Sequence, residues 1–413
     1  MNTRSYTFRD AELQSKPLRL INHVGQALSH FGLKFPKISE QSIVDQAVAR
    51  AKCSDFGSDS YREPLGQYLS SITNEAELNT FGRIVSKGML VNALANRLKL
   101  IDWHKKNPNA KKETIKQPWI ILGLPRTGTS LLSILLGLSP MARPLQHWEA
   151  ANPMPPADLA RAGEDPRITE CAKDIDALLN INPPLGAMHP FGATIAEECT
   201  AVFMYDLRTV GMETVGFAPS YGQWLSNADM TSAYDLHKLT LQALQSTQPT
   251  DQWVLKSPNH LWCLDELLAA YPDARIIWTH RNPSTVIPSI ASLTNALQWP
   301  GTTRRDPKPA AEDWKLKMSN AIDKGVTFDD KQKSNWCYHL RYDDLIANPI
   351  SAVDNIYRHF GVELGELQQQ RIKKWVEHRP QNTFGRHHYS AEDFGWTSEQ
   401  LGEEFEVYSR RYC

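Results

Sequence analysis

The stretch Pro118-Trp119-Ile120-Ile121-Leu122-Gly123-Leu124-Pro125-Arg126-Thr127-Gly128-Thr129-Ser130 joins an apolar run to a short polar turn, and a second apolar segment, residues 131–136, follows directly. This order predicts a buried strand, a tight turn and the start of a helix. Backbone N–H groups at a helix start have no partners within the helix, and the helix dipole places partial positive charge there. The turn is therefore expected to bind an oxyanion.

The turn has the glycine spacing of a nucleotide phosphate loop but lacks the lysine of that pattern. Four residues separate Gly123 from Gly128, and Thr129 stands where the pattern requires Lys. Arg126 supplies a fixed positive charge, and three hydroxyl donors follow it: Thr127, Thr129 and Ser130. We expect the turn to hold an anion without the lysine that triphosphate chemistry usually needs.

The composition limits the class of protein. The chain has 413 residues, 41% of them hydrophobic, so it can bury a large core. The formal net charge is -1, which favours neither a nucleic acid nor an anionic membrane as partner, and any positive field has to be local. Six scattered cysteines without a Cys-x-x-Cys pair are typical of a reducing compartment. The first ten residues do not resemble a signal peptide, and the apolar segment after the turn is too short to span a bilayer, so we expect a cytoplasmic protein.

The chain divides into a helical part and an alternating part. Residues 1–115 show helical periodicity, because apolar residues recur at three- and four-residue intervals. A polar, basic segment at 105–116 ends this region. We expect a helical N-terminal region over residues 1–115 and an α/β domain over residues 116–413.

Three later apolar runs predict further strands, each followed by a helix-like segment. The runs cover residues 253–255, 275–279 and 336–340. Ser257 and Asn282 each precede a proline, which is typical of an N-cap with Pro at the first helical position. The alternation predicts a central parallel sheet flanked by helices. The intervening proline-rich segment is expected to be irregular, with one helix at 168–179.

A polar or basic residue follows the end of each predicted strand: Arg126, Lys256, Arg281 and Tyr342. In a parallel sheet, ligands bind beyond the carboxyl ends of the strands, so these residues should gather at one edge. Ser289 lies eight residues after Arg281, in the following helix. We expect Arg281 and Ser289, together with Lys256, to bind a second anionic group, separate from the one on the turn.

Three further stretches accompany these residues: Leu255-Lys256-Ser257-Pro258, Pro272-Asp273-Ala274-Arg275 and Tyr342-Asp343-Asp344-Leu345. Together, this set of residues resembles the PAPS-dependent sulfotransferases. PAPS is 3′-phosphoadenosine-5′-phosphosulfate. The resemblance covers about residues 118–365 and is closest to the bacterial branch related to the tyrosyl-protein sulfotransferases. It implies a P-loop-like nucleotide-binding core with a closing segment at 366–413. The implied activity is in-line transfer of the sulfuryl group from PAPS to a hydroxyl of a small or medium-sized organic acceptor.

The resemblance also implies which residues bind PAPS. The 5′-phosphosulfate would contact the loop residues Arg126, Thr127, Gly128, Thr129 and Ser130. Arg281 and Ser289 match the pair that binds the 3′-phosphate, and Tyr342 matches a tyrosine near the adenine. Arg386, within residues 385–389, stands at about the place of a basic segment that closes over the 3′-phosphate.

The general base stays open among several residues. Cytosolic relatives carry a His where this chain has Pro258, so that assignment does not transfer. Tyrosyl-protein relatives use a Glu downstream of the loop, and Glu149 stands at about that distance. Glu149 is therefore the first choice and His147 the second, with Glu197 and Glu198 as further candidates. The expected catalytic set is Glu149, His147, Arg126 and Lys256.

No metal is expected, because backbone amides and Arg126 can stabilise the charge on the leaving oxygen. The acceptor pocket is expected to lie in residues 141–230 and the N-terminal helices, whose apolar character favours a phenolic, steroid or lipid-like acceptor. The expected partner is thus a small-molecule acceptor. Neither a nucleic acid partner nor a membrane span is expected, and a homodimer is left as an open possibility. Two alternatives remain: a P-loop small-molecule kinase, which would normally use the loop Lys and Mg²⁺, and a non-catalytic nucleotide-binding protein.

Overall fold

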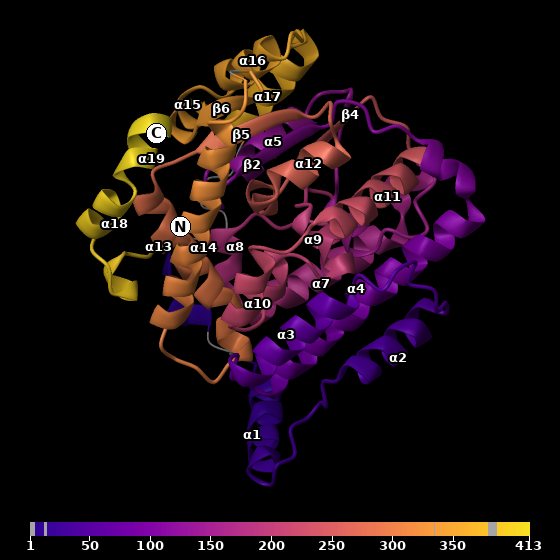
Figure 1. Ribbon diagram of the computed structural model, residues 1–413, viewed down its shortest axis with the longest axis vertical. Coiled ribbons are helices and arrows are strands. Elements are labelled where there is room, and N and C mark those ends of the chain that lie inside the picture. The colour runs from indigo at the N-terminus through magenta and orange to yellow at the C-terminus, as the bar shows by residue number, and fades with distance from the viewer. Residues whose placement is uncertain (1–4, 12–14, 334, 379–385) are drawn as a thin grey trace.

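A computed structural model of the chain describes residues 5–11, 15–333, 335–378 and 386–413, and shows a sheet surrounded by helices (Figure 1). The five parallel strands have the order β3-β4-β2-β5-β6. Their bounds are β2 (Trp119–Gly123), β3 (Ala142–Pro144), β4 (Gln252–Lys256), β5 (Arg275–His280) and β6 (Cys337–Arg341). The four predicted strands are confirmed. The edge strand β3 was not predicted, because it is three residues long and ends in Pro144, a residue that only an edge strand tolerates readily.

The helices of the described chain follow in order. They are α1 (Lys16–His30), α2 (Glu40–Ala51), α3 (Arg62–Asn74), α4 (Thr80–Lys106), α5 (Thr129–Gly137), α6 (His147–Ala151), α7 (Pro166–Ile181), α8 (Pro184–Met188), α9 (Thr200–Phe203), α10 (Pro219–Leu225), α11 (Thr231–Thr247), α12 (Leu264–Ala270), α13 (Pro283–Gln298), α14 (Lys308–Asp329), α15 (Tyr342–Ala347), α16 (Pro349–His359), α17 (Glu366–His378), α18 (Ser398–Glu404) and α19 (Glu406–Tyr412). The helices expected within residues 1–115 and at 168–179 are confirmed. Within the described ranges, no helix is both long and apolar enough to cross a bilayer.

The central strand β2 explains the continuous apolar run of the sequence, because both of its faces are covered. Ile120 and Leu122 belong to a large hydrophobic cluster on one face of the sheet. Trp119 and Ile121 belong to a second cluster on the other face, built mainly with α5 and α16. All five residues of β2 are buried. A strand buried on both sides needs apolar residues at successive positions rather than at alternate ones.

The N-terminal helices and the sheet share a core. Leu94 and Leu98 of α4 belong to the same hydrophobic cluster as Ile120 of β2. The helix α4 ends at Lys106, inside the basic segment that was expected to mark the boundary. In Figure 1 the indigo helices lie at the lower end of the molecule, below the sheet. The division into residues 1–115 and 116–413 stays a proposal.

Candidate active site

The turn after β2 has a backbone shape suited to an anion. Arg126 and Gly128 adopt left-handed conformations, with φ of 71° and 91°, and α5 begins at the next residue, Thr129. A Cβ atom at Gly128 would lie only 3.0 Å from Cδ2 of Tyr342, so a larger residue would crowd the loop. Alternating conformations of this kind direct successive N–H groups toward one point. The first turn of α5 therefore offers N–H donors at the carboxyl edge of the sheet.

Thr127 holds the loop in place rather than presenting its hydroxyl outward. Its Oγ1 donates to the carbonyl oxygen of Leu124 at 2.7 Å and lies 2.6 Å from the hydroxyl of Thr279 in β5. The side chain is fully buried. Of the loop residues predicted to bind PAPS, Thr127 can thus contribute only its backbone. Thr129 and Ser130, in contrast, line a cavity.

Four residues that were predicted to bind PAPS contact one another in a single cluster. Nε of Arg126 donates to Oγ of Ser289 at 3.2 Å, and its Nη1 donates to the carbonyl of Met188. Nη1 of Arg281 donates to the carbonyl oxygen of Arg126 at 3.0 Å. The Arg281 guanidinium lies 4.2 Å from the centre of the Tyr342 ring. The residues predicted to bind the second anion therefore contact the loop instead of standing apart from it, because β2 and β5 are neighbouring strands.

The two guanidinium groups of this cluster are bonded to carbonyl and hydroxyl oxygens. Among the described residues, neither Arg126 nor Arg281 forms an ion pair with a carboxylate. Burial lowers the pKa of Arg126, and the nearby charge of Arg281 lowers it further. Two buried or half-buried cations side by side are costly unless an anion neutralises them. The arrangement therefore indicates an anionic ligand.

A cavity of about 700 Å³ opens beside this cluster. Its polar lining includes the loop, Arg281 and Tyr342, and its apolar lining includes Trp262, Ile290, Leu293, Leu297 and Trp314. A cavity of this size suits a small organic molecule. The segments 186–191 and 197–214 contribute to the lining, as expected, but no described residue before Pro125 does. The N-terminal helices pack behind the cavity in the shared core instead of lining it.

Glu197 and Glu198 line the cavity because their segment runs along the ends of two strands. The N–H of Glu197 donates to the carbonyl of Leu145, just after β3, at 2.7 Å. The N–H of Cys199 donates to the carbonyl of Lys256, at the end of β4, at 2.8 Å. Oε1 of Glu198 accepts from Nζ of Lys256 at 3.1 Å. The side chain of Lys256 is 1% exposed and that of Glu198 is 23% exposed, so the carboxylate is the partner that faces the cavity.

His147 and Glu197 form an ion pair beside the cavity. Nδ1 of His147 lies 2.5 Å from Oε2 of Glu197, and Oε1 of Glu197 accepts from the N–H of Glu198 at 2.8 Å. Burial alone would raise the pKa of Glu197, but His147 and the charge of Lys256 outweigh it and hold this pKa at about 2. Burial opposes a charge on His147, yet its bond to Glu197 raises its pKa above the ordinary value. Because its pKa is lowered to about 2 by this ion pair, Glu197 is a weak proton acceptor.

This ion pair predicts a pH-dependent contribution to stability. Glu197 has a lowered pKa, so its contribution to folding stability is present above pH 4.5, the ordinary pKa of the group. This contribution is lost as the pH falls toward about 2. His147 has a raised pKa, so its contribution to folding stability is present below pH 6.5, the ordinary pKa of the group. This contribution is lost as the pH rises through the pKa that His147 has in the folded protein. We expect His147→Asn to lower the melting temperature more at pH 5.5 than at pH 8.5. Equal losses at both pH values in thermal unfolding would contradict the pairing.

Glu149, the first choice for the base, lies elsewhere. Its Oε1 accepts from Nη2 of Arg143 at 2.5 Å, and its Oε2 accepts from the N–H of Gln146 at 3.3 Å, which caps α6. Its side chain is 2% exposed, and Glu149 is absent from the cavity lining. The carboxylate neutralises an arginine and completes a capping box. The sequence did not reveal this role, because Gln146 is an unusual N-cap residue.

The C-terminal segment that was expected to close over the 3′-phosphate is partly described. Residues 379–385 and the side chain of Arg386 lie outside the described residues. The backbone of β7 (Arg386–His387) pairs with β1 (Ser5–Tyr6). His387 Nε2 lies 2.7 Å from Oγ of Ser292, one helical turn after Ser289 in α13. Burial, followed by the charge of Arg126, lowers the pKa of His387 to about 4. His387 thus lies near the cluster of Arg126 and Ser289, and the role of Arg386 stays a prediction.

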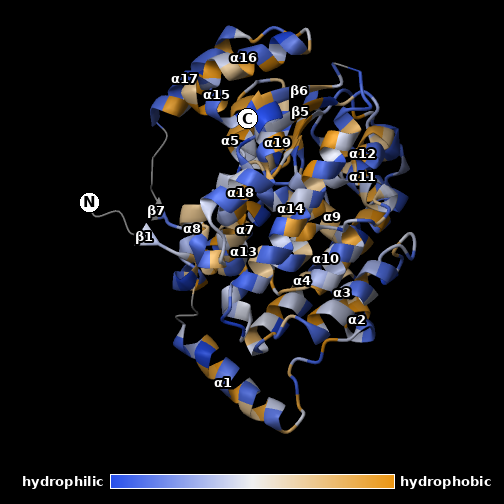
Figure 2. Ribbon diagram, turned by 60° about the vertical axis from the view of Figure 1, so that its left-hand side comes forward, coloured by the Kyte–Doolittle hydropathy of each residue, from blue (hydrophilic) through white to orange (hydrophobic). Residues whose placement is uncertain are grey.

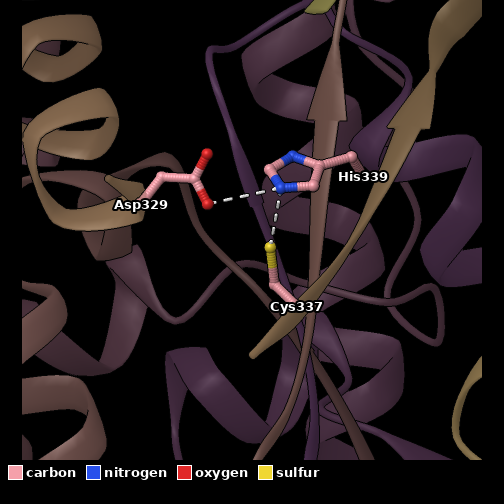
Figure 3. A group of neighbouring side chains, drawn as sticks. All are labelled: Asp329, Cys337 and His339. Atoms are coloured by element: carbon pink, nitrogen blue, oxygen red, sulfur yellow. Dashed lines mark hydrogen bonds and ion pairs between the residues drawn. The ribbon is translucent and has the colours of Figure 1, made fainter. Parts of the chain in front are cut away.

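One group among the described residues could hold a metal ion, and it lies away from the cavity (Figure 3). Figure 3 shows one nitrogen of the His339 ring facing both the carboxylate of Asp329 and the thiol of Cys337. Its Nε2 lies 3.3 Å from the sulfur and 3.5 Å from Oδ1 of Asp329. Asp329 also accepts hydrogen bonds from three further groups: Trp336, Arg411 and Tyr412. These contacts tie the end of α14 to β6 and α19, which gives the group a structural role.

The chain is similar to several known proteins. The family model described as "Sulfotransferase family" matches residues 118–366. The crystal structure of sulfotransferase STF1 from Mycobacterium tuberculosis H37Rv is 31% identical, with a TM-score of 0.81, over 90% of this chain and 99% of that one. The structure of sulfotransferase STF9 from Mycobacterium avium is 27% identical, with a TM-score of 0.83, over 92% of this chain and 98% of that one.

A curated relative has a narrower match. The omega-hydroxy-beta-dihydromenaquinone-9 sulfotransferase Stf3 of Mycobacterium bovis is 26% identical over 38% of this chain and 40% of its own length. The chain therefore matches less than half the length of the curated relatives that it resembles. The family match covers most of the chain, and the similarity to STF1 covers nearly all of it. With its P-loop-like turn and parallel sheet, this chain belongs to the sulfotransferase family.

Proposed function

We propose that this protein transfers the sulfuryl group of PAPS to a hydroxyl group of an apolar organic acceptor. The observation that carries this proposal is the contact cluster of Arg126, Arg281 and Ser289 beside the loop. PAPS carries a 5′-phosphosulfate and a 3′-phosphate on one adenosine, so it needs two adjoining anion sites. The loop would take the first group, and Arg281 with Ser289 would take the second.

The loop residues would support the chemistry by electrostatics. When bound, PAPS supplies an SO₃ group attached to a phosphate oxygen, and that oxygen gains negative charge as the S–O bond breaks. The N–H groups at the start of α5 and the charge of Arg126 are fixed in place before the reaction, so they stabilise this charge without rearranging. Arg281 and Ser289 act at a distance from the bond that breaks, and they hold the donor in line with the acceptor.

Glu198 is the proposed general base. Its carboxylate lines the cavity, and Lys256 holds it from behind at 3.1 Å. As the acceptor oxygen bonds to sulfur, Glu198 takes the hydroxyl proton, and adenosine 3′,5′-bisphosphate leaves with the electrons of the broken S–O bond. Glu149 has no part in this proposal, since its side chain is buried against Arg143 and does not line the cavity.

The cavity lining supports an apolar acceptor. Trp262 and Trp314 come from different elements, η6 (Pro258–Trp262) and α14, and α13 supplies three aliphatic side chains, Ile290, Leu293 and Leu297. Such walls favour a hydrophobic body that carries one hydroxyl group toward Glu198. The name of the Mycobacterium bovis relative gives an omega-hydroxylated dihydromenaquinone as its substrate. That name agrees with a hydroxyl acceptor here.

Sulfuryl transfer can be tested directly. The protein is incubated with PAPS labelled with ³⁵S and a panel of phenols, sterols and long-chain alcohols, with and without EDTA. We expect label in one acceptor class, an equal amount of released adenosine 3′,5′-bisphosphate, and no effect of EDTA. Transfer of label from γ-³²P-ATP with Mg²⁺ instead would identify a kinase. Binding of the bisphosphate without turnover of any acceptor would identify a non-catalytic nucleotide-binding protein.

A further inference from the structure

Helix α1 exposes an apolar stripe to solvent. Leu20, Val24, Leu28 and Phe31 recur at three- and four-residue intervals, so they share one face of the helix. Their side chains are 63%, 53%, 39% and 82% exposed. Figure 2 shows α1 projecting from the lower end of the molecule, with hydrophobic residues along it. Contiguous apolar surface of this kind normally has a binding partner.

The attachment of α1 to the body uses another face. Gly25 is the buried residue of the helix, and a Cβ atom there would lie 1.7 Å from Oγ1 of Thr80 in α4. Oδ1 of Asn22 accepts from the N–H of Phe81 at 2.8 Å. These contacts anchor α1 through a small and a polar residue. The fold therefore fixes the helix without using its apolar stripe.

The apolar surface continues beyond the helix. Leu33 and Phe35 follow in the next segment and are also mostly exposed. We name residues 16–37 the α1 surface. It combines the helical stripe with two further large side chains and an adjacent glycine at position 32. Aromatic and aliphatic side chains of this kind are typical of helices that insert into the boundary between lipid headgroups and acyl chains.

The charge of the α1 surface is uniformly basic. Residues 16–37 contain no Asp or Glu and four fixed cations: Lys16, Arg19, Lys34 and Lys37. A groove of about 600 Å³ beside α1 is lined by further basic residues, Arg83 and Arg305, and Glu77 is the acid among its described lining residues. The whole chain carries a net charge of -1, so this positive charge is local. Basic residues beside an apolar stripe attract anionic lipids.

We propose that the α1 surface docks on an anionic lipid bilayer, with the stripe at the headgroup boundary and the lysines among the headgroups. A helix of 15 residues is about 22 Å long, which suits a helix lying in the membrane plane. A second copy of the chain fits less well, because a two-fold interface would place like charges opposite each other. The proposal does not depend on the proposed function, although docking would bring the cavity to membranes that hold apolar alcohols.

Vesicle sedimentation with the full chain tests this proposal. We expect the protein to bind vesicles of phosphatidylglycerol and phosphatidylcholine, to bind pure phosphatidylcholine weakly, and to dissociate in high salt. The double variant Val24→Glu/Phe31→Glu should bind anionic vesicles at least ~10-fold more weakly, because two inserted apolar groups become charged. The matched control Leu316→Glu/Val407→Glu changes exposed apolar residues on α14 and α19 and should bind like the wild type.

Two results would overturn the proposal. One is equal vesicle binding by the α1 variant and the control variant, with both folded as judged by their melting temperatures. The other is a dimer, seen by light scattering in the absence of lipid, that the Val24→Glu/Phe31→Glu change dissociates while no variant binds vesicles. That second result would assign the α1 surface to another copy of the chain. If the Lys34→Glu/Lys37→Glu variant no longer prefers anionic vesicles over pure phosphatidylcholine, the proposed attraction between the basic residues and anionic lipids is supported.

Discussion

Arg281→Ala is expected to weaken the binding of adenosine 3′,5′-bisphosphate by between ~10- and ~100-fold, the range for loss of a hydrogen bond to a charged group. The substitution removes the cation assigned to the 3′-phosphate. It also removes the bond from Nη1 to the carbonyl oxygen of Arg126, which braces the loop. Because the side chain packs on Tyr342 rather than in the hydrophobic core, the fold should survive. Isothermal titration calorimetry with the bisphosphate measures the effect.

Two variants make the Arg281 result specific. Arg281→Lys keeps the charge but loses the planar fork and the stacking on Tyr342, so it should bind with intermediate affinity. Arg358→Ala removes an exposed arginine of α16 that pairs with Asp354, and it should bind normally. If Arg281→Ala and Arg358→Ala bind the bisphosphate equally well, the assignment of the 3′-phosphate to Arg281 is wrong.

Glu198→Gln is expected to lower turnover by between ~10²- and ~10⁴-fold, the usual range for loss of a general base. An amide cannot take the proton of the acceptor hydroxyl. Binding of the bisphosphate should change little, since Glu198 contacts Lys256 and Thr200 rather than the loop. Steady-state kinetics with PAPS and calorimetry with the bisphosphate separate the two effects. Glu198→Asp keeps the charge beside the buried Lys256 and should retain part of the activity.

Glu149→Gln is the matched control for Glu198→Gln. It should leave the turnover within a few-fold of the wild type and lower the melting temperature, because the substitution leaves Arg143 without its acidic partner. The reverse pattern, with turnover lost in Glu149→Gln and kept in Glu198→Gln, would restore the assignment made from the sequence. A loss in both variants with intact bisphosphate binding would place both carboxylates in the reaction.

The fold could be predicted largely from local patterns. A strand covered on both faces requires a continuous apolar run, and residues 119–123 supply one. Asn282 and Ser257 are the N-caps that the sequence indicated, each followed by proline. The edge strand β3 could not be predicted, because three residues that end in proline carry no periodic signal. Its pairing depends on β4, more than a hundred residues later in the chain.

The contacts among the predicted anion-binding residues were easier to predict than the surroundings of the carboxylates. Arginine at a strand end and serine in the next helix keep their relation through local geometry, and the structure brings Arg281 and Ser289 to Arg126. A carboxylate, by contrast, gives no local sign of its partner. Glu198 meets Lys256 58 positions away, whereas Glu149 meets Arg143 six positions away. Which of them faces a cavity depends on how residues 195–199 lie against β3 and β4.

The sequence by itself determined the parallel sheet, the turn after its central strand and the residues that follow each strand, because these features follow from interactions between neighbours along the chain. Only the tertiary structure decided that Arg281 and Ser289 contact Arg126, that Glu198 rather than Glu149 lines the cavity, and that α1 leaves its apolar stripe in solvent. Each of these depends on which distant segments pack together. Burial and ion pairing are properties of that packing and cannot be assigned to a residue alone.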